Sequence, residues 1–193
     1  INFFYVHEAA DIERAARNFV YGKTITSGQR CSSIQEVLVD RKVAKAFIDR
    51  VLELAPGVVH GPGGSDELTS ADSDPDSWSC PPLVSPEQRD RLTALVSSSL
   101  EHGAELLYQA QLPEELTQSG NYFPFTLLTG VDKNNPLYEQ EAFGPAGIIT
   151  PVENMVEAVE LINSKVGILM DHEGSVESAV LSQRTEKALD LFD

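Results

Sequence analysis

Short β-branched runs that lead directly into amphipathic helices constrain the fold of this chain most strongly. The run EVLVD at residues 36–40 predicts a strand, and the segment 42–54 predicts a helix with its apolar residues on one face. A strand joined closely to a helix is the repeating unit of layered α/β proteins. We therefore expect an α/β fold with a largely parallel sheet and flanking helices.

The same alternation recurs along most of the chain. Asp11 is placed to cap a helix over residues 11–23, and Ser85 followed by Pro86 is a strong start signal for a helix that reaches Leu100. Further strands are expected at 104–109, 122–129, 147–151 and 176–182, and further helices at 152–163 and from Thr185 onward. No internal repeat is visible, so residues 1–193 are expected to form one unit.

Residues 56–82 have a different composition from the rest of the chain. Proline, glycine and acidic residues dominate this stretch, and it contains neither lysine nor arginine. Such a composition buries little apolar surface. We expect a solvated acidic surface loop, pinned at Trp78.

The charge and the cysteines exclude several classes of function. The 193 residues carry 30 acidic and 14 basic side chains and a net charge of -16, which opposes binding to nucleic acid or anionic membranes. No apolar run approaches the roughly 20 residues that a membrane span needs, and no signal peptide is visible. The two cysteines have neither metal-binding nor disulfide-framework spacing, so we expect no metal and a reducing, cytoplasmic setting.

The segment Gly28-Gln29-Arg30-Cys31 allows two interpretations of its cysteine. A lone cysteine is commonly a small buried apolar residue. Here, however, the glycine permits a sharp turn, and backbone N–H groups exposed in such a turn would favour a thiolate and bind an oxyanion. Cys31 is therefore also a candidate nucleophile. Cys80 lies in a loop-like Cys-Pro-Pro context, and we interpret it as structural.

The segment YEQEAFGP at residues 138–145 is a second candidate. Its plainest interpretation is a tight turn with solvated acids. Alternatively, the Glu141 carboxylate accepts hydrogen bonds from sugar hydroxyls while the Phe143 ring packs against a flat ring, as in sites for nucleotide cofactors.

Taken together, in this order and at this separation, the two segments resemble the aldehyde dehydrogenase superfamily. Its members carry a Gly-Gln-x-Cys segment, matched at residues 28–31, and later a Glu-x-Phe-Gly-Pro segment, matched at residues 141–145. The flanking sequence is also similar, most clearly over residues 9–54 and 100–163. The resemblance implies the α/β catalytic domain of that superfamily.

The resemblance also implies a chemistry. Cys31 would attack an aldehyde, the thiohemiacetal would pass hydride to NAD or NADP, and water would release a carboxylic acid from the resulting thioester. Glu141 and Phe143 would position the nicotinamide ribose. The family's cofactor-binding domain, its oxyanion-hole asparagine and its general-base glutamate have no counterpart in residues 1–193. The resemblance thus covers a catalytic-domain portion of a protein expected to be a homo-oligomer acting on a small-molecule aldehyde.

Some positions depart from the family pattern. Thr26 stands where the family usually has asparagine, and His172 and Glu173 form an isolated pair that we interpret as a surface turn. Two alternatives stay open: a non-catalytic relative that serves in oligomerisation or partner binding, and a thiol-dependent hydrolase or acyl-transferase that uses Cys31 without a cofactor.

Overall fold

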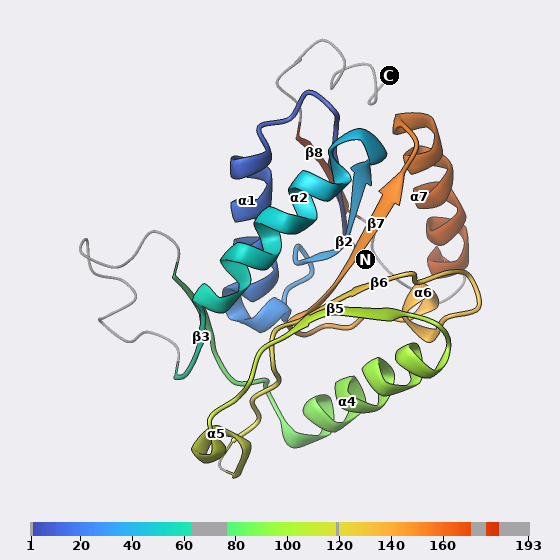
Figure 1. The fold of residues 1–193 in the computed structure, drawn as a ribbon. Helices are drawn as coiled ribbons and strands as arrows, with labels where there is room; N and C mark the ends of the chain where they lie inside the picture. The colour runs from blue at the N-terminus through green and yellow to red at the C-terminus, as the bar shows by residue number, and fades with distance from the viewer. Residues whose placement is uncertain (1, 63–76, 119, 171–176, 182–193) are drawn as a thin grey trace.

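A computed structural model describes residues 2–62, 77–118, 120–170 and 177–181 of the chain. Its centre is a six-stranded sheet in the order β5-β6-β7-β2-β1-β8 (Figure 1). The strands are β1 (Asn2–Val6), β2 (Ile34–Asp40), β5 (Glu105–Gln109), β6 (Thr126–Thr129), β7 (Ala146–Val152) and β8 (Glu177–Leu181). All neighbours pair in parallel except β5 and β6, which are antiparallel. The predicted α/β fold with a largely parallel sheet is confirmed.

The helices begin close to the predicted caps. The Asp11 side chain accepts a hydrogen bond from the Arg14 backbone N–H at 3.1 Å, which caps helix α1, and Ser85 caps α4 by accepting from the Gln88 N–H at 3.3 Å. The helices are α1 (Ile12–Thr24), α2 (Arg41–Leu54), α4 (Pro86–Glu101), α5 (Glu114–Gln118), α6 (Pro136–Glu139) and α7 (Met155–Met170), with 3₁₀ turns η1 (Ile25–Gly28) and η2 (Ala55–Gly57).

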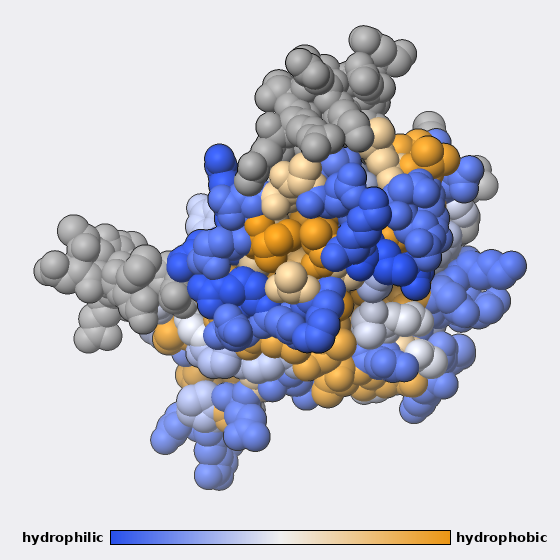
Figure 2. Space-filling model, turned by 45° about the horizontal axis from the view of Figure 1, so that its top comes forward, coloured by the Kyte–Doolittle hydropathy of each residue, from blue (hydrophilic) through white to orange (hydrophobic). Residues whose placement is uncertain are grey.

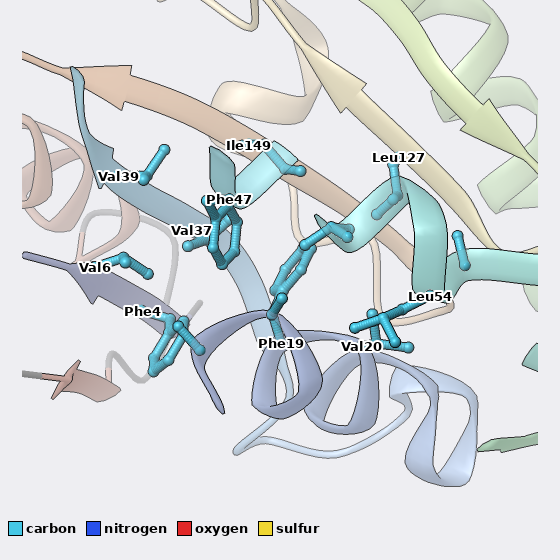
Figure 3. Packing of buried hydrophobic residues seen from close by; sticks show 14 of the residues in the cluster. Phe4, Val6, Phe19, Val20, Val37, Val39, Phe47, Leu54, Leu127 and Ile149 are labelled. Carbon is cyan, nitrogen blue, oxygen red and sulfur yellow. The ribbon is translucent and has the colours of Figure 1, made fainter. Parts of the chain in front are cut away.

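One face of the sheet is covered by α1 and α2, which lie side by side (Figure 1). Phe19 of α1 and Phe47 of α2 meet with their ring centroids 6.0 Å apart, above Val37 of β2 and Ile149 of β7 (Figure 3). All four side chains are fully buried. This packing holds α1, and therefore the turn that follows it, firmly against the sheet.

The opposite face is covered by α4, α6 and α7. Leu92 of α4 packs with Ile148 of β7, and Ala158 of α7 packs with Leu38 of β2. A buried ion pair also lies on this face: the Lys165 ammonium of α7 donates to the Glu36 carboxylate of β2. The sheet is therefore the middle of three layers.

The prediction of a loop over all of residues 56–82 is wrong at both ends of that range. Strands β3 (Val58–His60) and β4 (Trp78–Cys80) pair in parallel as a separate two-stranded sheet. Trp78 is buried, and Phe125 donates its backbone N–H to His60 Nε2 at 3.0 Å. Residues 63–76, between these strands, lie outside the described residues.

Other element boundaries differ for local reasons. The strand predicted at 122–129 begins only at Thr126, because Pro124 has no N–H and the Phe125 N–H is bonded to the imidazole described above. The helix predicted at 152–163 starts at Met155, because Asn154 Oδ1 accepts the Val156 N–H at 2.9 Å. The helix predicted from Thr185 and the pair His172–Glu173 lie outside the described residues.

The end of the sheet at which the parallel strands β2 and β7 finish is largely hydrophilic (Figure 2). Strands β2 and β7 run toward the top of Figure 1, and Figure 2 brings that end forward: hydrophilic residues predominate, with smaller apolar patches between them. Among the helices that the structure describes, none has the length and apolar character needed to cross a membrane.

Candidate active site

Both predicted segments lie at the amino ends of neighbouring parallel strands. Cys31 precedes β2, and the segment Glu141–Pro145, which we call the EAFGP segment, precedes β7. Strands β2 and β7 pair with Glu36 opposite Ile148. Because parallel neighbours begin at the same edge of a sheet, the fold brings the two segments to one edge, although more than a hundred residues separate them in sequence.

The two segments touch through their backbones at a pair of glycines. Gly28 has φ +67°, and a Cβ at this position would overlap the Gly144 carbonyl group, lying 2.8 Å from its carbon. Thr26 and Ser27 also have positive φ, at 53° and 51°. A left-handed backbone costs about 1–2 kcal/mol for a residue other than glycine. The turn before Cys31 is therefore strained and depends on its contacts.

A segment from residues 80–84 supplies several of these contacts. Gln29 Oε1 accepts the Val84 backbone N–H at 2.7 Å. Ser27 Oγ donates to the Pro81 carbonyl oxygen and lies 3.4 Å from Cys80 Sγ. Cys80 is buried, and burial raises the pKa of its thiol to about 11. Cys80 thus lies in the packing behind the turn as a neutral thiol, consistent with a structural role.

Cys31 itself is exposed, so its interpretation as a small buried apolar residue is wrong. Its backbone is nevertheless held. Asn2 of β1, which is buried, donates from Nδ2 to the Cys31 carbonyl oxygen and to the Ser33 carbonyl oxygen, the latter at 3.1 Å. The thiol therefore projects from a fixed backbone and is accessible to an electrophile.

The EAFGP segment is held mainly by α4. Gln88 Nε2 donates to the Phe143 carbonyl oxygen at 2.7 Å, and the Arg91 guanidinium donates to the Glu141 carbonyl oxygen at 3.2 Å. Phe143 has φ +47° and remains 37% exposed, while Glu141 is half-buried. An aromatic face and a carboxylate two residues apart form a surface suited to a ring and a hydroxyl-bearing sugar.

The polar side chains that fix this geometry were not predicted from the sequence. They are Asn2, Gln35, Gln88 and Arg91. None of them stands out from the other residues of its element, and its role depends on which elements become neighbours. Only the spacing of Gln88 and Arg91, three residues apart on one helix face, could have indicated a shared partner.

Other possible sites lie elsewhere in the structure. A groove of about 650 Å³ runs between α4 and the stretches 109–117 and 122–124, and none of Cys31, Glu141 and Phe143 lines it. Within the described ranges, no group of three or more His, Cys, Asp or Glu side chains is arranged to hold a metal ion.

The sequence of this chain matches a known protein family over nearly its whole length. A family model described as "Aldehyde dehydrogenase family" matches residues 1–190. A probable succinate-semialdehyde dehydrogenase [NADP(+)] of Synechocystis is 32% identical over 160 residues, covering 83% of this chain and 32% of the relative. A vanillin dehydrogenase of Pseudomonas fluorescens is 32% identical over 187 residues, covering 96% of this chain and 34% of the relative.

Solved structures show the same fold. The crystal structure of a betaine aldehyde dehydrogenase from Staphylococcus aureus in complex with NAD+ superposes with a TM-score of 0.79 at 22% identity, covering 99% of this chain and 35% of that chain. The chain thus spans about a third of the length of the curated relatives it matches. From the family match over residues 1–190, this chain belongs to the aldehyde dehydrogenase family.

Proposed function

We propose that the full-length protein containing this chain oxidises an aldehyde to a carboxylic acid with NAD or NADP. The observation that carries the proposal is the backbone contact between Gly28 and Gly144, which sets the turn of Cys31 against the EAFGP segment. Family membership and the names of the relatives, which include an NADP-dependent enzyme, support the same reaction.

Cys31 is the proposed nucleophile. Its thiolate sulfur adds to the carbonyl carbon of the aldehyde, so that a C–S bond forms and the carbonyl oxygen becomes an oxyanion, which backbone N–H groups of the turn stabilise. A bound nicotinamide ring would accept the hydride that leaves this carbon. The thioester that remains on Cys31 is attacked by water, the C–S bond breaks, and the thiolate is regenerated as the acid departs. This attack requires a base that takes one proton from the water.

Glu141 and Phe143 are the proposed cofactor-binding residues. The half-buried Glu141 carboxylate is an acceptor for the hydroxyls of the nicotinamide ribose, and the exposed Phe143 ring offers a flat apolar face beside it. Because α4 holds the carbonyl groups of both residues, their side chains project from a fixed segment.

The proposal is tested on the full-length protein with three variants. A thiol-selective electrophile should modify Cys31, and NAD or NADP should bind to wild type and to Cys31→Ala but more weakly to Glu141→Gln. Cys80→Ala is the matched control and should keep both labelling and turnover. If the electrophile labels Cys80 and leaves Cys31 unmodified, the proposal that Cys31 is the nucleophile is refuted. If the wild-type protein binds neither NAD nor NADP, the result would instead favour the alternative that this protein is a non-catalytic relative.

We further propose that residues 1–193 form a catalytic-domain portion of a cytoplasmic homo-oligomer that acts on a small-molecule aldehyde and not on nucleic acid. The net charge of -16 supports the exclusion of nucleic acid. Strand β5 lies at an edge of the sheet, and the unpaired backbone groups of an edge strand can pair with another chain. Light scattering of the full-length protein tests the oligomer: a mass of one protomer would contradict it.

A further inference from the structure

The carboxyl ends of β2 and β7 form a topological switch point of the sheet. The two strands are parallel neighbours, with Asp40 opposite Val152. The chain leaves β2 into α2 on one face of the sheet and leaves β7 into α7 on the other face (Figure 1). Connections that diverge in this way open a crevice at the strand ends, where α/β proteins commonly bind ligands. This end lies about 20 Å along β2 from the end that Cys31 precedes.

A cavity of about 320 Å³ lies in this crevice. Its lining comes from the ends of β1 and β2 and from the segments in which α2 and α7 begin. Its volume is at the lower end of the range for small-molecule sites, so it suits a ligand of a few carbon atoms.

Tyr5 of β1 brings an unsatisfied hydroxyl to the lining of this cavity. The residue is 3% exposed, and within the described ranges Oη has no hydrogen-bond partner. The ring itself is well held: it meets the His7 ring edge-on, with centroids 6.3 Å apart, and packs with Leu38 of β2 and Ala158 of α7. A buried hydroxyl without a partner is costly. A ligand that bonds to Tyr5 Oη would therefore remove an existing cost.

The charges around the cavity favour a cation. The lining holds three carboxylates, those of Glu8, Asp40 and Glu153, and one ammonium, that of Lys42. Lys42 is paired with Glu8, and Arg41, which lies outside the lining, is paired with Glu153 at 2.6 Å. With three carboxylates against these two cations, one negative charge remains in excess.

The excess charge lies close to the unsatisfied hydroxyl. Asp40 is 4% exposed, and its Oδ1 accepts the Lys42 backbone N–H at 3.1 Å. A carboxylate has two oxygens with about four lone-pair sites, so Asp40 can accept further donors. Burial, and then the charges of Asp40 and Glu8, raise the pKa of Tyr5 to about 12, as expected where the potential at Oη is negative.

An anion is disfavoured, although two helices begin beside the cavity. Helix N-termini attract anions through unpaired N–H groups. Here Asp40 accepts the N–H of Lys42, and Asn154 Oδ1 accepts those of Val156 and Glu157 at 2.9 and 3.2 Å. Side chains of the protein thus occupy donors that an anion would use. In the described part of the chain, no group of three or more His, Cys, Asp or Glu side chains is arranged to hold a metal ion either.

We propose that this cavity is a binding site for the ammonium group of a small organic primary amine. The ammonium donates to Tyr5 Oη and to the Asp40 carboxylate, and the carbon chain of the amine lies against Met155 and Val156 at the start of α7. Three N–H donors allow a primary ammonium to bond to both groups at once. The site does not depend on the proposed aldehyde oxidation.

The first experiment compares three probes of equal length by isothermal titration calorimetry on the full-length protein at neutral pH and constant ionic strength. The probes are n-butylamine, 1-butanol and butyrate. The amine should bind at least about tenfold more tightly than the other two, because only the amine carries a positive charge. Equal affinities for the amine and the alcohol, or tighter binding of butyrate, would overturn the proposal.

The second experiment locates the bound amine with variants. Tyr5→Phe and Asp40→Asn should each weaken n-butylamine binding about tenfold. Both should fold, because Tyr5→Phe removes only the unsatisfied hydroxyl and asparagine caps a helix as well as aspartate does. Melting temperatures check this, so that a loss of affinity is not mistaken for a loss of fold.

The matched control is Tyr108→Phe, which removes a tyrosine hydroxyl from β5, away from the lining of the cavity. It should leave the affinity for n-butylamine unchanged. The proposal is overturned if folded Tyr5→Phe keeps the wild-type affinity, or if Tyr108→Phe loses as much affinity as Tyr5→Phe does. Because aldehyde turnover is not measured, a failure of this proposal and a failure of the proposed function remain distinguishable.

Discussion

Replacing Gly28 by alanine tests whether the turn of Cys31 depends on close contact with the EAFGP segment. Two costs are expected. The left-handed φ of +67° costs about 1–2 kcal/mol for a residue with a Cβ, and overlap of that Cβ with the backbone of Gly144 adds about 1–3 kcal/mol. Gly103→Ala is the matched control, because Gly103 has φ +93° but no atom within 4 Å of the added Cβ. Gly103→Ala should therefore lower the free energy of unfolding only by the cost of the left-handed backbone, about 1–2 kcal/mol.

The assay is thermal unfolding of the two variants and wild type, together with the rate at which a thiol electrophile modifies Cys31. At about 2–4 °C per kcal/mol for a domain of this size, Gly28→Ala should melt about 2–12 °C below Gly103→Ala. Only Gly28→Ala should change the labelling rate, because only it displaces the turn. Equal melting temperatures with unchanged labelling of Cys31 would refute the close contact.

Three further predictions concern Tyr5, His60 and the two cysteines. Among the residues that the structure describes, the buried Tyr5 Oη has no hydrogen-bond partner. Tyr5→Phe should therefore raise the free energy of unfolding by about 1 kcal/mol in chemical denaturation, and a loss of stability would contradict this. Burial lowers the pKa of His60, whose Nε2 accepts the Phe125 N–H. The unfolded chain therefore takes up this proton first, and stability should fall as pH drops below about 6.5, with a smaller fall in His60→Gln. Burial raises the pKa of the Cys80 thiol to about 11, whereas Cys31 is exposed. Iodoacetamide at pH 8 should therefore modify only Cys31 in the native protein, as measured by peptide mapping, and modification of Cys80 would contradict this prediction.

The elements with the clearest local signals were predicted well from the sequence. Helix α2 has strong apolar periodicity and α4 has a serine cap followed by proline, and both were placed within a residue or two. Strand β1 was missed because all five of its residues are buried, so that NFFYV shows no alternation. The short strands β3 and β4 were missed because their surroundings are rich in proline and glycine.

The sequence indicated three candidate residues of the site but not the groups that support them. Cys31, Glu141 and Phe143 lie in short segments with recognisable residue types. The contact between Gly28 and Gly144 depends on β2 and β7 becoming neighbours, which no local pattern specifies.

The central claim is that Cys31 carries the acyl group during aldehyde oxidation. The most direct measurement is acid quenching of the full-length protein during turnover with an aldehyde and NAD or NADP, followed by mass spectrometry of its peptides. We predict an acyl thioester on the peptide that contains Cys31 and neither adduct nor turnover in Cys31→Ala. An acyl adduct on another residue, or aldehyde oxidation that persists in Cys31→Ala, would contradict the account.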